Sequence, residues 1–179
     1  MSAVSIRAAA RSDLPAVLKL YAQPTIDDGA ILPLEAAQAV FERFRAYPDY
    51  TLYVAVEAGG AVVGSFALLV MDNIGHLGAP SGLVEAVVVD PARHREGIGR
   101  RMMHFALARC REKGCYKMAL SANIKRDKAH AFYESLGFQR HGYSFLVDLA
   151  VTPSPRPSRG EGRGEGRSRR APISARRGG

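Results

Sequence analysis

The chain has 179 residues, of which 47% are hydrophobic and 23% charged, and it carries a formal net charge of +8 at pH 7. This composition is that of an ordinary globular protein and argues against disorder over most of the length. The longest apolar runs, residues 61 to 71 and 84 to 89, are far shorter than the roughly 20 residues that a membrane-spanning helix needs. Arg7 and Arg11 interrupt the segment in which a signal peptide would be apolar, so we expect a cytoplasmic protein without membrane contact.

The positive charge is concentrated in the C-terminal part of the sequence. Residues 153 to 179 contain eight arginines and two glutamates, so they carry +6 of the total and leave +2 for the rest. Because this segment consists mainly of Pro, Ser, Gly and Arg, it lacks the apolar surface needed to offset the entropy of ordering. We expect one folded domain over residues 1 to 150 and a basic, disordered tail over residues 151 to 179. The tail either contacts nucleic acid nonspecifically through phosphate charge or is dispensable.

Hydrophobic periodicity and turn residues divide the folded part into strands and helices. In chain order, we expect a strand at residues 4 to 8, a helix beginning near Ser12, a helix at 34 to 47, strands at 51 to 57, 61 to 71 and 83 to 90, a helix at 97 to 113, a strand at 117 to 121, a helix at 127 to 136 and a strand at 142 to 149. Ser12 can cap the first helix, and Pro48 ends the second. A hairpin followed by strand, helix, strand units predicts an α/β fold with a mixed sheet and helices on both faces.

The segment VEAVVVDPARHREGIGRRMM, residues 84 to 103, joins a strand to a helix through a basic, glycine-containing turn. Backbone N–H groups at a helix start have no intrahelical partner, and the helix dipole adds partial positive charge there. An anion such as a pyrophosphate therefore fits at residues 95 to 100. Gly97 and Gly99 allow a ligand close to the backbone. The arginines that add positive charge around the turn are Arg93, Arg95, Arg100 and Arg101.

Spacing excludes two better-known phosphate motifs, and a purely structural helix start remains the alternative. The chain has no GxxxxGK[ST] sequence, and Met102 stands where a dinucleotide fingerprint has its third glycine. A second motif lies downstream, where Asn123 follows a predicted strand and AHAFYESLGF occupies residues 129 to 138.

Together the two motifs resemble the GNAT superfamily of acyl-CoA-dependent N-acyltransferases, over roughly residues 3 to 150. The first resembles the family's [QR]-x-x-G-x-[GA] loop, with His94 where Gln or Arg is usual. The resemblance implies a GNAT-like, largely antiparallel central sheet in which the fourth and fifth strands splay apart, with acetyl-CoA bound between them. It places the coenzyme contacts at Val87, Val88, Val89, His94, Arg95, Glu96, Gly97, Ile98, Gly99, Arg100 and Asn123.

The resemblance also implies catalytic roles, each with a structural alternative. Tyr133 aligns with the tyrosine that protonates the departing thiolate in many family members, or it simply packs its helix onto the sheet. Glu85 can accept the proton of the attacking ammonium, or it is a solvated or salt-bridged edge residue. Asn123 contacts the coenzyme or caps the next helix. The basic residues at that helix start either meet coenzyme phosphates or are solvated; they are Lys125, Arg126 and Lys128.

The sequence indicates the residues that would bind the acceptor amine less clearly. The resemblance places acceptors near the first two helices, where candidates are Tyr21, Asp27, Asp28 and Tyr53. The two aspartates can attract a cationic amine, but they can equally be turn residues. The five histidines have no metal-ligand spacing, so we expect no metal. Cys110 and Cys115 also lack zinc-type spacing, and we expect both to stay reduced, Cys110 as a buried helix residue.

These observations predict an acetyl-CoA-dependent N-acetyltransferase that moves the acetyl group directly to a primary amine of a small molecule. No nucleophile elbow of the GxSxG type is present, so a covalent enzyme intermediate is not expected. Three alternatives stay open: a protein or peptide N-acetyltransferase, a noncatalytic acyl-CoA-binding sensor module, and a domain tethered to nucleic acid by its tail. The sequence does not set the oligomeric state, and a homodimer is compatible with it.

Overall fold

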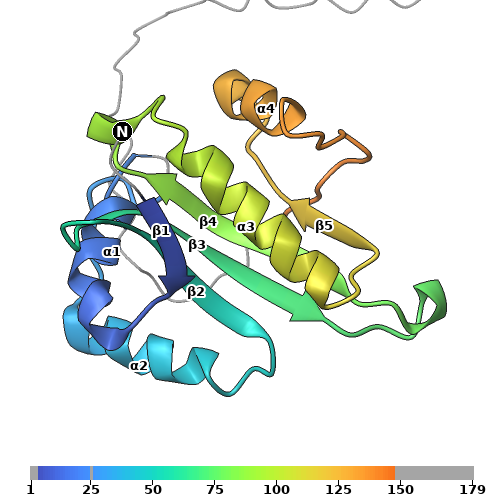
Figure 1. Ribbon diagram of the computed structural model, residues 1–179, viewed down its shortest axis with the longest axis horizontal. Helices are drawn as coiled ribbons and strands as arrows, with labels where there is room; N and C mark the ends of the chain where they lie inside the picture. The colour runs from blue at the N-terminus through green and yellow to red at the C-terminus, as the bar shows by residue number, and fades with distance from the viewer. Residues whose placement is uncertain (1–3, 25, 148–179) are drawn as a thin grey trace, which may run out of the picture. The chain divides into compact units, whose positions relative to one another are not determined.

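A computed structural model describes residues 4–24 and 26–147 (Figure 1). The strands are β1 (Val4–Ala8), β2 (Tyr50–Glu57), β3 (Val62–Met71), β4 (Ser81–Val89) and β5 (Lys117–Leu120). The α-helices are α1 (Leu14–Tyr21), α2 (Leu34–Phe44), α3 (Ile98–Glu112) and α4 (Asp127–Glu134), and short 3₁₀ turns span Arg11–Asp13, His76–Gly78 and Pro91–Arg93. The predicted basic tail lies outside the described residues. None of the described helices is long and apolar enough to cross a membrane.

The sheet confirms the predicted mixed and largely antiparallel architecture. Its strands follow one another in the order β1-β2-β3-β4-β5, with antiparallel pairs throughout except between β4 and β5. The parallel ladder of β4 and β5 runs only from Ser81↔Lys117 to Val84↔Leu120, while β4 continues to Val89. The two strands therefore splay apart beyond Val84, as expected; Figure 1 shows the gap between the end of β4 and the chain leaving β5.

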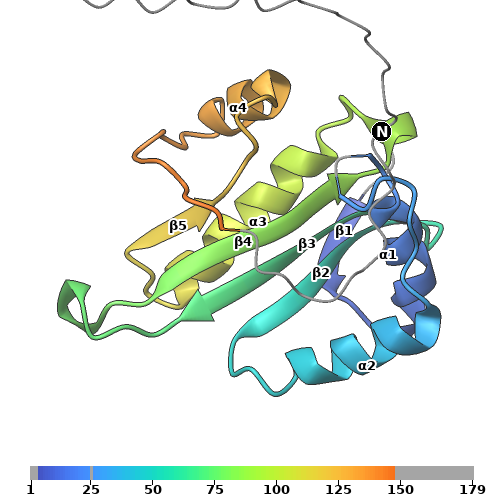
Figure 2. The same cartoon turned by 180° about the vertical axis from the view of Figure 1, so that it is seen from behind.

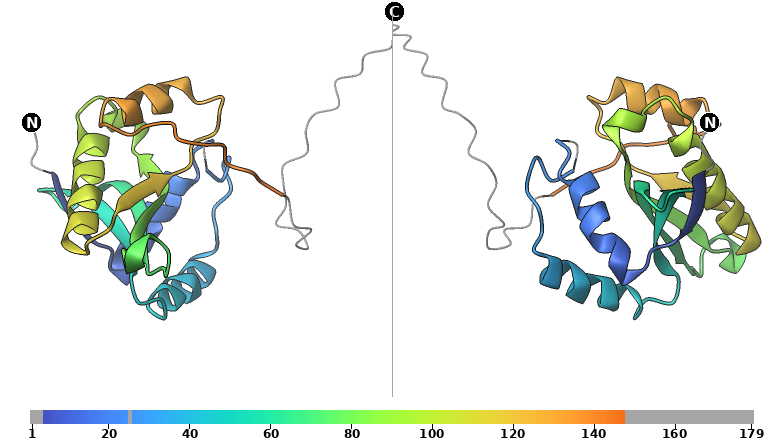
Figure 3. Two further views of the ribbon diagram at one scale, coloured as in Figure 1. Left: turned by 90° about the vertical axis from the view of Figure 1, so that its right-hand side faces the viewer. Right: turned by 60° about the vertical axis from the view of Figure 1, so that its left-hand side comes forward.

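Helices pack on both faces of the sheet, which follows from the period-two alternation of its strands. On one face, α3 contributes Ile98, Met102, Met103, Ala106 and Cys110 to a core that includes Ala55 and Phe66. On the other face, α1 packs Leu14 and Val17 against Leu52, Val54, Val56 and Ala67. Figure 3 shows α3 on one side of the sheet and α1 with α2 on the other, and the reverse view in Figure 2 has β4 in front of α3.

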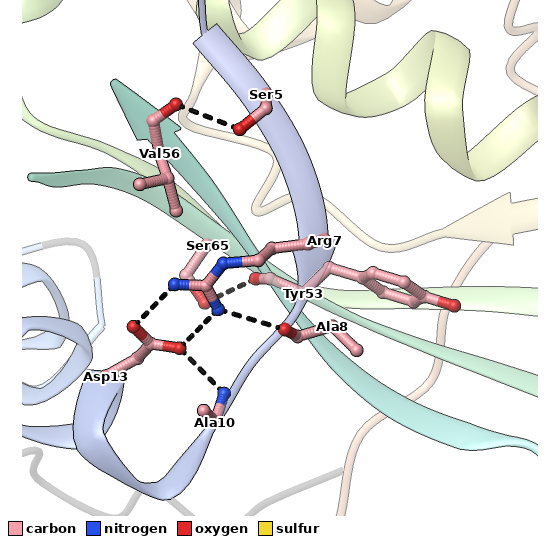
Figure 4. A network of polar contacts seen from close by, with 8 residues as sticks. All are labelled: Ser5, Arg7, Ala8, Ala10, Asp13, Tyr53, Val56 and Ser65. Atoms are coloured by element: carbon pink, nitrogen blue, oxygen red, sulfur yellow. Dashed lines mark hydrogen bonds and ion pairs between the residues drawn. The ribbon is translucent and has the colours of Figure 1, made fainter. Parts of the chain in front are cut away.

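The first helix begins later than predicted, and Ser12 does not cap it. A 3₁₀ turn precedes α1, and the carboxylate of Asp13 accepts the Ala10 N–H at 2.7 Å. The same carboxylate accepts two hydrogen bonds from the Arg7 guanidinium, at 2.6 and 2.9 Å, which ties the turn to β1 (Figure 4). Ser12 is exposed, whereas the side chain of Asp13 is only 9% exposed. The carboxylate of Asp13 therefore caps the 3₁₀ turn, whereas α1 itself begins without a side-chain hydrogen bond at its N-cap.

Two other boundaries also differ. The second helix ends at Phe44 and not at residue 47, because the chain turns before Pro48. The strand predicted at residues 142 to 149 is wrong for residues 142–147, which have no strand pairing; its last two residues lie outside the described chain. Alternation of apolar residues favours a strand only when a neighbouring strand supplies hydrogen-bond partners. The chain divides after Gly142 into two units, and residues 143–147 belong to the second.

Candidate active site

A β-bulge interrupts β4 where it parts from β5. Ala67 pairs with Glu85 and Ser65 pairs with Val88, so Phe66 lies opposite two residues of β4. One of the two, Ala86, has φ of 50°, a left-handed conformation that is uncommon for a residue other than glycine. The bulge reverses the side-chain alternation, so that Val87 and Val89 pack against the α3-side core. The predicted coenzyme-contacting valines thus lie on the part of β4 that β5 does not cover.

The loop between β4 and α3 has the geometry of an anion cradle. Arg95 and Gly97 both have positive φ, 69° and 79°, and Gly97 forms the N-cap of α3. The first hydrogen bond back into the helix is donated by the Arg101 N–H to the Gly97 carbonyl at 3.1 Å. The N–H groups of Ile98, Gly99 and Arg100 precede that bond, as at any helix start. A Cβ added at Gly97 would meet no atom within 4 Å, so open space lies beside the backbone at this helix start.

Arg93 holds this loop in place and does not add free positive charge to it, contrary to our expectation. Its guanidinium forms ion pairs with Glu57 at the end of β2 and, at 2.7 Å, with Glu96. These carboxylates raise the pKa of Arg93, and Arg93 in turn lowers the pKa of Glu96. Of the other three predicted arginines, Arg95 and Arg100 have exposed side chains and Arg101 is half-buried.

The carbonyl oxygen of Val89 contacts two side chains, and the sequence analysis did not predict these contacts. The side-chain amide of Gln23 donates a hydrogen bond to it at 3.2 Å, and the Nε2 of His94 lies 3.3 Å away. His94, the residue that departs from the family pattern, therefore contacts the end of β4 through its ring. Gln23 carries no local signal of this role, because its partner is 66 residues further along the chain.

Helix α4 and the residue after it contact the start of α3 through Phe132 and Ser135, which flank Tyr133. A Cβ added at Gly99 would lie 3.3 Å from Cζ of Phe132, and the Arg100 guanidinium donates to the Ser135 hydroxyl at 3.2 Å. Tyr133 is half-buried, with its ring centroid 5.2 Å from that of Phe132. Burial raises the pKa of the Tyr133 phenol, and the positive charge of Arg126 opposes this by a smaller amount. The phenol therefore keeps its proton at neutral pH and can donate it.

Glu85 is exposed on the opposite face from α3. It pairs with Ala67, whose side chain belongs to the α1-side core, and the negative charge of Glu85 adds to burial in raising the pKa of Tyr50. The carboxylate is accessible, so it can accept a proton from an amine, directly or through water.

The side chain of Asn123 stabilises the turn between β5 and α4. Its Oδ1 accepts the Lys125 N–H at 2.9 Å, and its backbone carbonyl accepts the Arg126 N–H at 2.9 Å. This is an Asx turn and not a cap of α4, whose N-cap is Arg126 without a side-chain hydrogen bond, and the side-chain nitrogen of Asn123 is not used in it. Lys125, Arg126 and Lys128 are exposed at the start of α4.

The structure separates the four acceptor candidates. Tyr53 stacks on Phe66 at 5.2 Å and meets Phe105 at 5.1 Å, so its ring packs against the α3-side core, away from Glu85. Asp27 and Asp28 are exposed turn residues, and Asp28 has φ of 48°. Tyr21 packs on the α1 face, where burial raises the pKa of its phenol and a hydrogen bond with Ser65 opposes the rise.

Cysteines and metal-ligating residues form no further site within the described part of the chain. No three His, Cys, Asp or Glu side chains gather there in a way that could hold a metal ion. Cys110 and Cys115 are free thiols, and burial raises the pKa of Cys110 to about 12. Cys110 is buried in α3, as predicted.

Comparison with known proteins identifies the class to which this fold and site belong. Residues 14–138 match the model of the Acetyltransferase (GNAT) family, which is more than half of the chain, so the chain belongs to the GNAT family. Membership in this family indicates an acyltransferase.

The relatives of this chain are named for different acceptors. N-alpha-acetyltransferase RimI of Mycobacterium tuberculosis (strain ATCC 25618 / H37Rv) is 33% identical over 78% of this chain and 80% of its own length. Glucosamine 6-phosphate N-acetyltransferase of Trypanosoma brucei brucei is 36% identical over 50% of this chain, and the match spans only 59% of that relative. A solved acetyltransferase of Trypanosoma brucei superposes with a TM-score of 0.70 at 29% identity, covering 82% of this chain and 100% of that one.

Proposed function

We propose that the chain transfers an acetyl group from acetyl-CoA directly to a primary amine of a small molecule. The observation that carries this proposal is the convergence of the anion cradle, the uncovered end of β4 and the protonated phenol of Tyr133, which α4 holds against the start of α3 through Phe132 and Gly99. Backbone N–H groups at residues 95 to 100 would hold the pyrophosphate of the coenzyme. The edge of β4 at Val87, Val88 and Val89 would pair with its pantetheine arm.

The reaction needs protons to move at the nitrogen and at the sulfur, for which the chain offers two groups. The acceptor nitrogen attacks the thioester carbonyl carbon, a C–N bond forms and the C–S bond breaks. Glu85 accepts one proton from the ammonium before the attack, and Tyr133 gives its phenolic proton to the departing sulfur. The second proton that the nitrogen loses restores the phenol. A backbone N–H of β4 that points at the carbonyl oxygen stabilises the negative charge developing there. Burial of Tyr133 supports its role, because it keeps the phenol protonated before transfer.

The relatives support two classes of acceptor. Glucosamine 6-phosphate names a small amine, whereas the RimI relative, which matches a larger share of this chain, is named for N-alpha-acetylation. A peptide N-terminal amine is therefore the second candidate acceptor. The half-open face at Glu85 is compatible with either, since an exposed carboxylate restricts the charge of the acceptor more than its size.

Release of free thiol from acetyl-CoA, followed with a panel of amines, amino acids and peptides, tests the proposal. Tyr133→Phe removes the proton donor and keeps the ring, so amine-dependent release should fall at least about tenfold. Tyr116→Phe is a matched control, because Tyr116 is 40% exposed, stacks on His76 and precedes β5, whereas α4 follows the other end of that strand. Coenzyme binding without turnover on the whole panel would contradict the proposal and favour a sensor module.

A further inference from the structure

A hollow of about 470 Å³ opens beside the C-terminal end of α2. It is lined by Val40, Arg43, Phe44, Ala46, Tyr47 and Tyr50. The rings of Phe44 and Tyr50 stack with centroids 4.1 Å apart, and the ring of Tyr47 meets that of Tyr50 edge to face at 5.7 Å. Tyr47 is 55% exposed, so part of this aromatic surface faces solvent. The volume lies within the usual range for small-molecule sites.

The hollow and Glu85 share one face of the sheet. Tyr50 pairs with Leu69, which pairs with Leu83, and in the next row on the same face Ala67 pairs with Glu85. Directly paired residues project from the same face. From strand spacing and rise, the backbones of Tyr50 and Glu85 are about 12 Å apart, and their side chains shorten that gap. Leu69 and Leu83 are half-buried and form an apolar floor between them.

The charged residues at the two ends of this apolar floor favour one orientation of a bound amine. Arg43 is the charged residue in the lining of the hollow, so a positively charged amine is not favoured there. The aromatic rings favour a flat, apolar group in the hollow, since ring pairs gain stabilisation beyond the area that they bury. The exposed carboxylate of Glu85 at the other end favours the ammonium group.

We propose that the hollow and Glu85 together bind acceptor amines that carry an aromatic ring, with the ring against Tyr47 and Tyr50 and the amine directed toward Glu85. This inference rests on the proposed function, in which Glu85 accepts the proton of the amine, and it narrows the acceptor to aromatic amines. The residues at the C-terminal end of α2, which lie outside the cradle and α4, would then determine which acceptor amines bind.

Direct binding measurements test the ring subsite without requiring turnover. Equilibrium dialysis of the full chain with 2-phenylethylamine and 2-cyclohexylethylamine compares two amines of similar size and equal charge. The phenyl compound should bind about three to ten times more tightly, and Tyr47→Leu should remove the difference. Tyr116→Leu, the control, should keep it. Equal affinity for the two amines in the wild type, or a preference that survives Tyr47→Leu, would overturn the inference.

A second pair of ligands tests the direction of binding. Glu85→Gln should weaken binding of 2-phenylethylamine several-fold and leave binding of the uncharged 2-phenylethanol unchanged, because only the amine carries the charge that Glu85 attracts. Loss of both ligands to the same extent would contradict the assignment, provided that circular dichroism shows the variant to be folded. Tyr47→Leu should weaken both ligands alike.

Thiol release separates failure of this inference from failure of the proposed function. If both amines are acetylated with equal kcat/KM, the acetyltransferase proposal stands and the aromatic subsite is wrong. If neither of the two amines nor any other acceptor of the panel is acetylated, but ring-selective binding depends on Tyr47, the subsite stands and the proposed reaction is wrong.

Discussion

The side-chain amide of Gln23, just after α1, donates a hydrogen bond to the carbonyl oxygen of Val89, the last residue of β4, at 3.2 Å. The ring of His94 approaches the same oxygen at 3.3 Å. Gln23 also starts the turn after α1, since its own carbonyl accepts the Ile26 N–H at 3.0 Å. One carbonyl therefore links the turn after α1, the end of β4 and the loop that precedes α3.

Replacing Gln23 with Met removes the amide donor and keeps the length of the side chain. We expect the free energy of unfolding to fall by about 1 kcal/mol, and KM for acetyl-CoA to rise about fivefold, the equivalent of that energy in binding. Urea denaturation and saturation kinetics measure the two effects. Gln38→Met is the control, because Gln38 accepts a hydrogen bond from the exposed Arg11; equal effects of the two substitutions would contradict the linking role of Gln23.

The contact of Gly99 with Phe132 sets the distance between α3 and α4. A Cβ at Gly99 would lie 3.3 Å from the Phe132 ring, so Gly99→Val should displace α4 and the neighbouring Tyr133. We expect kcat to fall between about tenfold and a hundredfold, since small displacements of a catalytic group are costly. Gly59→Val is the control, because an added Cβ there meets no atom within 4 Å. A folded Gly99→Val variant with unchanged kcat would refute this positioning argument.

The pH dependence of turnover follows from the raised pKa of Tyr133. Its phenol stays protonated to a higher pH than the ordinary value of 10.0, so loss of this acid should cause no decrease in kcat between pH 7 and 10. A pH–rate profile of the wild type checks this. If kcat instead falls with an apparent pKa well below 10, and Tyr133→Phe removes that fall, the surroundings lower the pKa of the phenol. The inference that burial raises this pKa would then be wrong.

The Arg7–Asp13 ion pair should make stability depend on pH in the acid range. Hydrogen bonds from Arg7 hold the pKa of Asp13 below its ordinary value of 3.8, so the folded state binds fewer protons than the unfolded state between those two values. The stabilisation is complete above the ordinary pKa and is lost as the pH falls through the lowered one. Asp13→Asn should therefore cost about 1 to 3 kcal/mol at pH 7, and the difference from wild type should shrink below pH 3.8.

Chemical denaturation at several pH values measures this difference. Asp49→Asn is the control, because Asp49 pairs at 2.7 Å with the exposed Lys113, and such surface pairs contribute about 0 to 1 kcal/mol. A deficit of Asp13→Asn that stays constant from pH 7 to pH 3 would show that the carboxylate acts through packing and not through its charge.

Sequence patterns predicted the elements that local chemistry determines. The strand before the cradle and the helix after it follow from an apolar run, a turn with Gly97 and a helical period, all within neighbouring residues. The helix around Phe132 was predicted for the same reason, since the residues that define it are adjacent in sequence. Its place beside the start of α3 depends on the contact of Phe132 with Gly99, 33 residues earlier in the chain, and only the family resemblance indicated it.

The features that the sequence patterns did not predict depend on contacts between residues that lie far apart in the sequence. The contact of Gln23 with Val89 depends on how α1 packs across the sheet, which no local pattern reports. Ser12 and Asp13 are both good capping residues, and only the position of Arg7 on β1 decides for Asp13. Likewise Tyr53 fits a polar acceptor site by residue type, but its register opposite Phe66 places it in the core.

The bulge at Ala86 adds one residue to β4, so the alternation of side chains between the two faces of the sheet shifts by one residue there. Residues before it keep the facing set by their pairing with β5, whereas residues after it face the opposite way from the one that an unbroken pleat would give them. If the same residues followed an unbroken pleat, Val87, Val88 and Val89 would each project from the other face of the sheet. The single extra residue thus lets the two halves of β4 face independently, which leaves Val87 and Val89 on the side of α3.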